Sequence, residues 1–109
     1  MIFLAMKQHI LALCAADLSN QILKWNDYLR HEKRLSAHTL RAYNTDAEHF
    51  ISFMADHLGE PPSLNAISSI TIRDFRSWMS KKATSGASNA SRARSLSGVK
   101  NLLTWLDKQ

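Results

Sequence analysis

The sequence has one cysteine, Cys14, and only three glycines and two prolines in 109 residues. A single cysteine excludes an internal disulfide framework and a cysteine-based zinc site. No glycine-rich phosphate-binding loop is present. No apolar run reaches the length of a membrane span. We therefore expect a reduced, cytoplasmic, single-domain protein rather than a secreted disulfide scaffold.

The ionisable residues form no catalytic or metal-binding pattern. The five histidines include no pair at i and i+4, and the carboxylates are scattered singly. No cysteine or carboxylate completes a metal site, and no Ser–His–Asp set can be assembled. We expect no cofactor, no metal ion and no enzymatic activity in this chain.

Acidic residues are missing between Asp74 and Asp107. That stretch is rich in Ser, Thr and Asn, and its basic residues are Arg76, Lys81, Lys82, Arg92, Arg94 and Lys100. A second basic cluster surrounds Ser36 and consists of Arg30, Lys33, Arg34 and Arg41. Lys and Arg neutralise phosphates, and the net charge of +5 fits an acidic partner. Charge alone favours nucleic acid no more than it favours a solvated surface without a partner.

Hydrophobic periodicity predicts four helices and no strand. The first begins near Asp17 or Ser19, ends in the polar run 31–34 and carries the stripe Leu18, Ile22, Trp25 and Leu29. The second begins at Ser36, a good N-cap, and ends at Gly59. Its apolar stripe is Leu40, Tyr43, Ala47, Phe50 and Met54.

A long loop, 59–70, leads to a third helix that Thr71 caps, with Asp74 three residues later and Gly86 at its end. Its expected inner face is Ile72, Phe75 and Trp78 or Met79. Ser88 caps the fourth helix, whose stripe is Leu96, Val99, Leu103 and Leu106. Together the stripes predict one core that contains Trp25, Leu29, Leu40, Tyr43, Phe50, Phe75, Leu96, Val99 and Leu103.

The fourth helix also has a polar side opposite its apolar stripe. We place on it Arg94, Ser97, Asn101, Thr104 and Lys108, with Lys100 at the edge and Gly98 on the same outer side. Such a face can contact phosphates or base edges in a major groove. Arg92 points nearer the inner side and is a weaker candidate.

The start of the second helix could also bind a phosphate, because it carries Ser36, His38, Thr39 and Arg41. An ordinary capped helix explains these residues as well.

Three segments, in this order, resemble one known family. Residues 35–43, LSAHTLRAY, resemble the L-S-x-x-T-L-x-x-Y start of a tyrosine-recombinase core-binding domain. Residues 58–59 and 70–75 resemble its loop and third helix. Residues 91–100, followed by 102–106, resemble its last helix, R-x-L-S-x-[LV]-[RK]-x-[FL]-[FL]-x-[WF]-L. The resemblance covers residues 17–109 and is greatest for the Xer branch, XerC type.

The resemblance implies an all-α, four-helix, SAM-like orthogonal bundle over 17–109, with 1–16 as a leader that is helical or partly disordered. In this family such a domain forms half of a C-shaped clamp around duplex DNA, and a separate catalytic domain performs strand cleavage. Nothing here matches that second domain, so we expect a domain of a longer recombinase. The implied partners are duplex DNA, the catalytic domain of the same recombinase and other protomers in a synaptic tetramer. The implied role is chromosome dimer resolution or DNA integration.

Carried over by position, the family's DNA contacts fall on Ser36, Thr39, Arg41, Arg94, Ser97 and Lys100. Lys7 and Lys24 are then expected to lie away from the DNA, so that their removal leaves binding unchanged. The rival interpretation is a helical protein-interaction module whose basic face meets an acidic partner.

Overall fold

The computed structural model describes residues 12–109. Within this range the chain forms helices and no strands: α2 (Ala16–Asp27), the π-helix η1 (Tyr28–Glu32), α3 (Ala37–Leu58), α4 (Leu64–Ser68), α5 (Ile72–Thr84) and α6 (Asn89–Asp107). The expected all-α bundle is confirmed. Most of the expected leader, including Lys7, lies outside the described residues.

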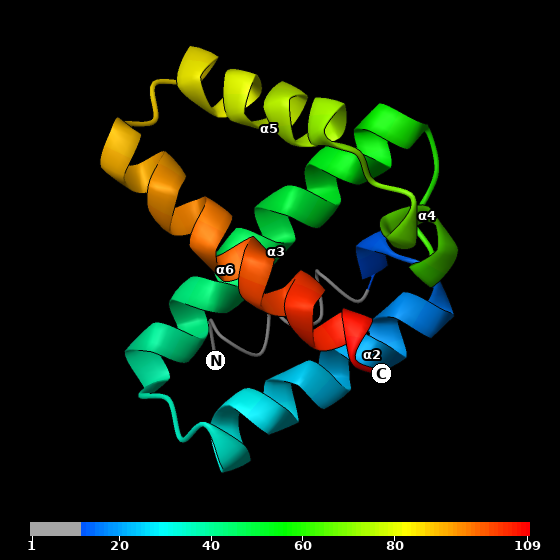
Figure 1. The fold of residues 1–109 in the computed structure, drawn as a ribbon, viewed down its shortest axis with the longest axis vertical. Helices are drawn as coiled ribbons and strands as arrows, with labels where there is room; N and C mark the ends of the chain where they lie inside the picture. The colour runs from blue at the N-terminus through cyan, green and yellow to red at the C-terminus, as the bar shows by residue number, and fades with distance from the viewer. Residues whose placement is uncertain (1–11) are drawn as a thin grey trace.

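The two long helices α3 and α6 cross in the centre of the molecule (Figure 1). α6 packs mainly against α3 and also contacts α2 and α5. In Figure 1, α5 lies on one side of the crossing, and α2 with η1 lies on the other. Because α6 has neighbours on three sides, one lengthwise strip of its surface remains for solvent or a partner.

The helix ends follow from single capping residues. The Ser36 hydroxyl accepts the Thr39 N–H at 3.2 Å, and the Ser88 hydroxyl accepts the Ser91 N–H at 3.1 Å. Thr71 and Asp74 form a reciprocal capping box at the start of α5. Gly59 ends α3 with a φ of 77°, the left-handed conformation that glycine adopts without a steric penalty. These four expected helix ends are confirmed.

The first helix differs from the expectation at its start. Its N-cap is Ala15, which makes no side-chain cap bond. At the other end α2 continues as η1, which ends at Glu32, inside the polar run 31–34 that was expected to end the helix. Arg34 then has a φ of 52°, and the Leu35 N–H donates to the Leu29 carbonyl at 3.1 Å, which closes the last turn. The expected end is therefore confirmed, whereas the π-helical turn before it was not expected.

The connection between α3 and α5 contains the short helix α4, which was expected to be loop. The Ser63 hydroxyl caps it by accepting the Ala66 N–H at 3.1 Å, and Ile67 is buried beneath it. The Asp17 carboxylate accepts the Leu64 N–H at 3.3 Å. The same carboxylate oxygen accepts the Leu18 N–H of α2 at 2.7 Å, so Asp17 ties the start of α4 to the start of α2.

The predicted residues do form one core, with unequal burial. Five of them are buried: Trp25, Leu29, Leu40, Phe50 and Val99. The other four pack against this cluster while partly exposed: Tyr43, Phe75, Leu96 and Leu103. Phe50 contacts the rings of both Phe75 and Trp78, with centroid distances of 5.7 and 5.0 Å. Ile72 was wrongly placed inside, because it opens α5 and is 70% exposed.

The buried side of α6 is rotated relative to the expectation. Its buried residues are Ser95, Gly98, Val99 and Leu102, whereas Leu96, Leu103 and Leu106 lie at the flanks. Gly98 faces α3 and was wrongly placed on the outer side. A β-carbon built on Gly98 would lie 2.7 Å from Oδ2 of Asp46, so the two helices touch where α6 has no side chain. The closest contact between α6 and α3 is therefore made at small residues of α6 and not at its leucines.

Candidate nucleic-acid interface

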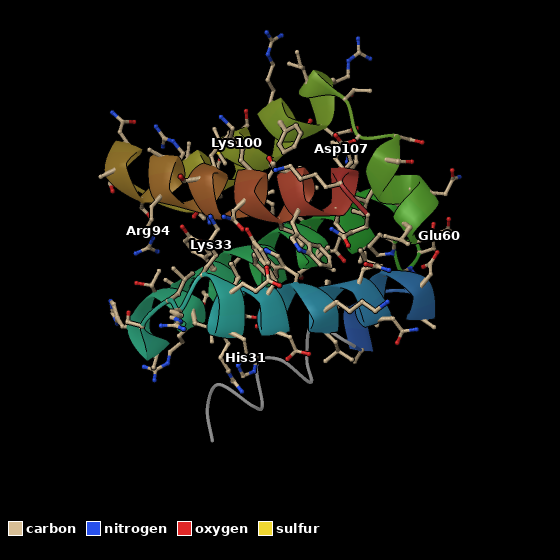
Figure 2. All side chains as sticks on the ribbon, turned by 60° about the horizontal axis from the view of Figure 1, so that its bottom comes forward. His31, Lys33, Glu60, Arg94, Lys100 and Asp107 are labelled. Carbon is tan, nitrogen blue, oxygen red and sulfur yellow. The ribbon has the colours of Figure 1, made fainter. Side chains whose placement is uncertain are left out.

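The outward strip of α6 carries the three expected contact residues. Arg94, Ser97 and Lys100 are all exposed, and Thr104 and Lys108 continue the strip toward the C-terminus. Figure 2 shows Arg94 near the N-terminal end of α6 and Lys100 further along the same helix. The helix thus presents cations separated by hydroxyl groups, a pattern that suits phosphate oxygens.

A buried carboxylate fixes the direction in which this strip faces. Asp46 of α3 is 1% exposed, and its Oδ1 accepts the hydroxyl of Ser95 at 3.2 Å. Burial raises the pKa of the Asp46 carboxyl, while the Ser95 bond and the nearby charge of Arg94 act in the opposite direction. Hydrogen bonds are directional, so the Ser95 bond restrains rotation of α6 about its own axis.

The start of α3 holds the other three expected residues. Ser36 is exposed, and its hydroxyl donates to Oγ1 of Thr39 at 3.1 Å while it also accepts the Thr39 N–H. The Ser36 hydroxyl therefore caps the helix, and the Thr39 hydroxyl accepts its hydrogen. Arg41 is exposed and lines a small hollow of about 270 Å³ together with Arg30.

The structure brings only part of the expected set into one concave surface. A groove of about 890 Å³ runs between α2–η1 and α6, and Ser97 and Lys100 line it. Ser36, Thr39, Arg41 and Arg94 are not among its lining residues. Lys24, which was expected to lie away from the DNA, also lines the groove together with Lys100. This proximity follows from α2 and η1 lying beside α6, which helical periodicity alone does not reveal.

The Arg92 guanidinium is hydrogen-bonded to neighbouring residues of the chain. Its Nη1 donates to the Ala87 carbonyl at 2.9 Å, and its Nη2 bonds the Asn89 side chain. Both partners lie at the start of α6, so Arg92 stabilises that helix end. Its weaker standing as a contact candidate agrees with this geometry.

Among residues 12–109, no helix is long and apolar enough to cross a membrane.

Comparison with known proteins places this arrangement in a family. Residues 22–109 match the family described as phage integrase, N-terminal SAM-like domain. Tyrosine recombinase XerC of Rhodospirillum centenum is 38% identical over 95 residues, which cover 87% of this chain and 28% of that protein. Tyrosine recombinase XerC of Brucella suis is 38% identical over 106 residues, covering 97% of this chain and 34% of that protein. No solved structure matches the chain.

The chain thus spans about a third of the length of the curated relatives that it matches. The match runs along nearly all of this chain and includes both α3 and α6. On these grounds the chain belongs to the phage integrase family of tyrosine recombinases, as its N-terminal SAM-like domain.

Proposed function

We propose that this domain binds duplex DNA for a Xer-type site-specific recombinase. The observation that carries the proposal is the outward strip of α6. Its cations and hydroxyls are exposed, while the Asp46–Ser95 bond holds the opposite side of the helix against α3. A strip that is both basic and restrained in orientation suits a regular array of phosphates.

In the proposed complex, Arg94 and Lys100 neutralise phosphates and Ser97, which lies between them in sequence, donates a hydrogen bond. The start of α3 supplies a second contact through Ser36, Thr39 and Arg41. Arg can bind a phosphate or a guanine edge through two parallel N–H groups, whereas Lys acts as a point charge. Base readout therefore falls to Arg41 more than to Lys100.

The domain would hold DNA and do no chemistry. The catalytic domain of the same recombinase would cleave and rejoin the strands, and neighbouring protomers on paired sites would complete a synaptic tetramer. Chromosome dimer resolution or DNA integration would be the outcome. The names and lengths of the tyrosine recombinase relatives support this division of labour.

Salt-dependent binding to labelled duplex DNA tests the proposal. Removing one phosphate contact lowers the slope of log affinity against log salt by about 0.9. Arg94→Ala and Lys100→Ala should each show this loss, with thermal stability almost unchanged. Arg73→Ala and Lys81→Ala are the matched controls, because both residues are exposed on α5 and neither lines the groove beside α6. The controls should leave the slope within error.

Equal losses in all four variants would mean that the basic charge is diffuse and that the strip is not a site. Wild-type binding that ignores salt, or that is absent even at low salt, would contradict DNA binding itself. That second result would favour the rival function.

The rival, a protein-interaction module, has one specific observation in its favour. A hollow of about 900 Å³ lies between α4 and the C-terminal part of α6, and its apolar lining includes Leu64, Ile67, Leu103 and Leu106. Partly exposed leucines of this kind are typical of protein contacts. The DNA proposal remains preferred because the hollow does not account for the basic strip.

A further inference from the structure

The groove between α2–η1 and α6 is lined by more cations than the proposed DNA contacts use. Besides Lys100, three further lysines line it: Lys24 on α2, Lys33 after η1 and Lys108 after α6. The acidic lining residues are Asp27 and Glu32, so the lysines exceed the acids. A concave surface with a net positive lining attracts an anion more strongly than a flat one, because low-dielectric walls focus the field.

The π-helical turn places Lys33 at this groove. The Lys33 N–H donates to the Tyr28 carbonyl at 3.1 Å, five residues back, and the Lys33 ammonium lies 6.0 Å from the centre of the Tyr28 ring. Tyr28 in turn contacts Trp105 of α6, with 6.3 Å between ring centres. The ring pair joins the two walls of the groove, and Lys33 lies among its lining residues.

Asn101 adds a polar group of known orientation. Its Oδ1 accepts the indole N–H of Trp25 at 2.9 Å, and Trp25 is fully buried. An indole nitrogen can only donate, so this bond determines which end of the Asn101 amide points inward. The group that remains for the groove is the NH₂, which donates and does not accept. A fixed donor surrounded by lysines favours a ligand rich in acceptor oxygens.

We propose that this groove binds the sugar–phosphate backbone of DNA, with the Asn101 amide as a fixed donor to a phosphate oxygen. The inference rests on the proposed function and extends the DNA contact from α6 onto α2 and η1. Trp25 acts as a positioning residue, since its indole orients the amide without touching DNA. The contact is to the backbone, so it strengthens binding equally on every duplex sequence.

Asn101→Asp is the sharpest test. It keeps the shape of the side chain but replaces the NH₂ donor by a negatively charged acceptor oxygen. One carboxylate oxygen can still accept the Trp25 N–H, while the other presents negative charge where the NH₂ donated. The affinity for duplex DNA should fall at least about tenfold, since like charges brought together in an interface are strongly unfavourable. Asn65→Asp makes the same change on exposed α4, outside the groove, and controls for net charge. It should change the affinity less than about twofold.

Lys33→Ala gives a second measurement that does not disturb the core. It should lower the slope of log affinity against log salt by about 0.9, as the loss of one phosphate contact does. Two unrelated duplex sequences should be used throughout. The groove would be rejected as a DNA site if Asn101→Asp and Asn65→Asp changed the affinity equally and Lys33→Ala left the salt dependence unchanged. Arg94 and Lys100 would then remain as contacts. A loss confined to one sequence would overturn the backbone assignment. Failure of the wild type to bind duplex DNA would instead reject the proposed function.

Discussion

Gly98→Ala should have two opposing effects on stability at the crossing of α3 and α6: a gain in helix propensity and a steric cost. Gly98 is buried within α6, where replacing glycine by alanine normally stabilises a helix by roughly 0.5–1 kcal/mol. Here the new methyl group would lie 2.7 Å from Oδ2 of Asp46, 3.1 Å from its Cβ and 3.3 Å from its Cγ. Turning the carboxylate does not relieve the contacts with Cβ and Cγ, so α6 or α3 has to move.

The steric cost should exceed the propensity gain. Overpacking a tight interior typically costs about 1–3 kcal/mol. Asp46 is 1% exposed and held by Ser95, so it has little freedom to yield. The expected net destabilisation is about 1–2 kcal/mol, which would lower the melting temperature by roughly 5–15 °C for a domain of this size.

A double-mutant cycle with Asp46→Ala isolates the contact. Removing the carboxylate relieves the contacts with Oδ2 and Cγ but leaves the Cβ contact at 3.1 Å, so Gly98→Ala should cost less in that background than in the wild type. Gly59→Ala is the control: Gly59 has a φ of 77° and nothing within 4 Å of a built β-carbon, so its cost should be the same with or without Asp46. Chemical denaturation gives the four free energies of unfolding. If Gly98→Ala stabilises the wild type, or costs the same in both backgrounds, the close contact does not constrain the helix crossing.

Two further predictions concern the register of α6 and the capping box of α5. Leu102 is 1% exposed, whereas Leu103 is only partly buried. Leu102→Ala should therefore lower the free energy of unfolding by about 2–5 kcal/mol, and Leu103→Ala clearly less. The reverse order in denaturant unfolding would contradict the observed register. The Thr71 backbone N–H, assisted by His57, lowers the pKa of the Asp74 carboxyl. A lowered pKa in the folded state means that ionised Asp74 stabilises the fold above the unfolded-state pKa, and that this contribution is lost as the pH falls through the folded-state pKa. Melting temperatures measured across the acidic range should fall less steeply for Asp74→Asn than for the wild type, and parallel curves would refute the linkage.

The helix starts and the fold class could be predicted because they depend on local chemistry. Ser36, Thr71 and Ser88 cap helices through hydroxyls that reach N–H groups three residues later, and sequence alone shows that spacing. The core residues could also be predicted, since their helical spacing is visible in the chain. Neither feature requires knowledge of which helices touch.

The rotation of α6 and the groove could not be predicted, because both depend on how the helices are packed. Leucine spacing favours Leu103 as an inward residue, but α6 approaches α3 through Gly98 and Ser95, and Leu103 covers a flank. Lys24 shares a groove with Lys100 only because α2 lies beside α6. One signal was available in the sequence: a glycine and a serine three residues apart in a helix are typical of a close helix–helix contact.

Two polar bonds, one buried and one partly buried, orient α6 more strictly than its apolar contacts do. Apolar packing tolerates small rotations, whereas the Ser95–Asp46 and Asn101–Trp25 bonds each fix a direction. Arg94 and Lys100 each precede one of these anchors by one residue, so each basic side chain projects about 100° around the helix from a fixed point. An entirely apolar interface could hold the bundle together equally well. What the polar anchors add is a defined angle for the cations, and DNA, with phosphates at regular spacing, is the kind of ligand for which that angle matters.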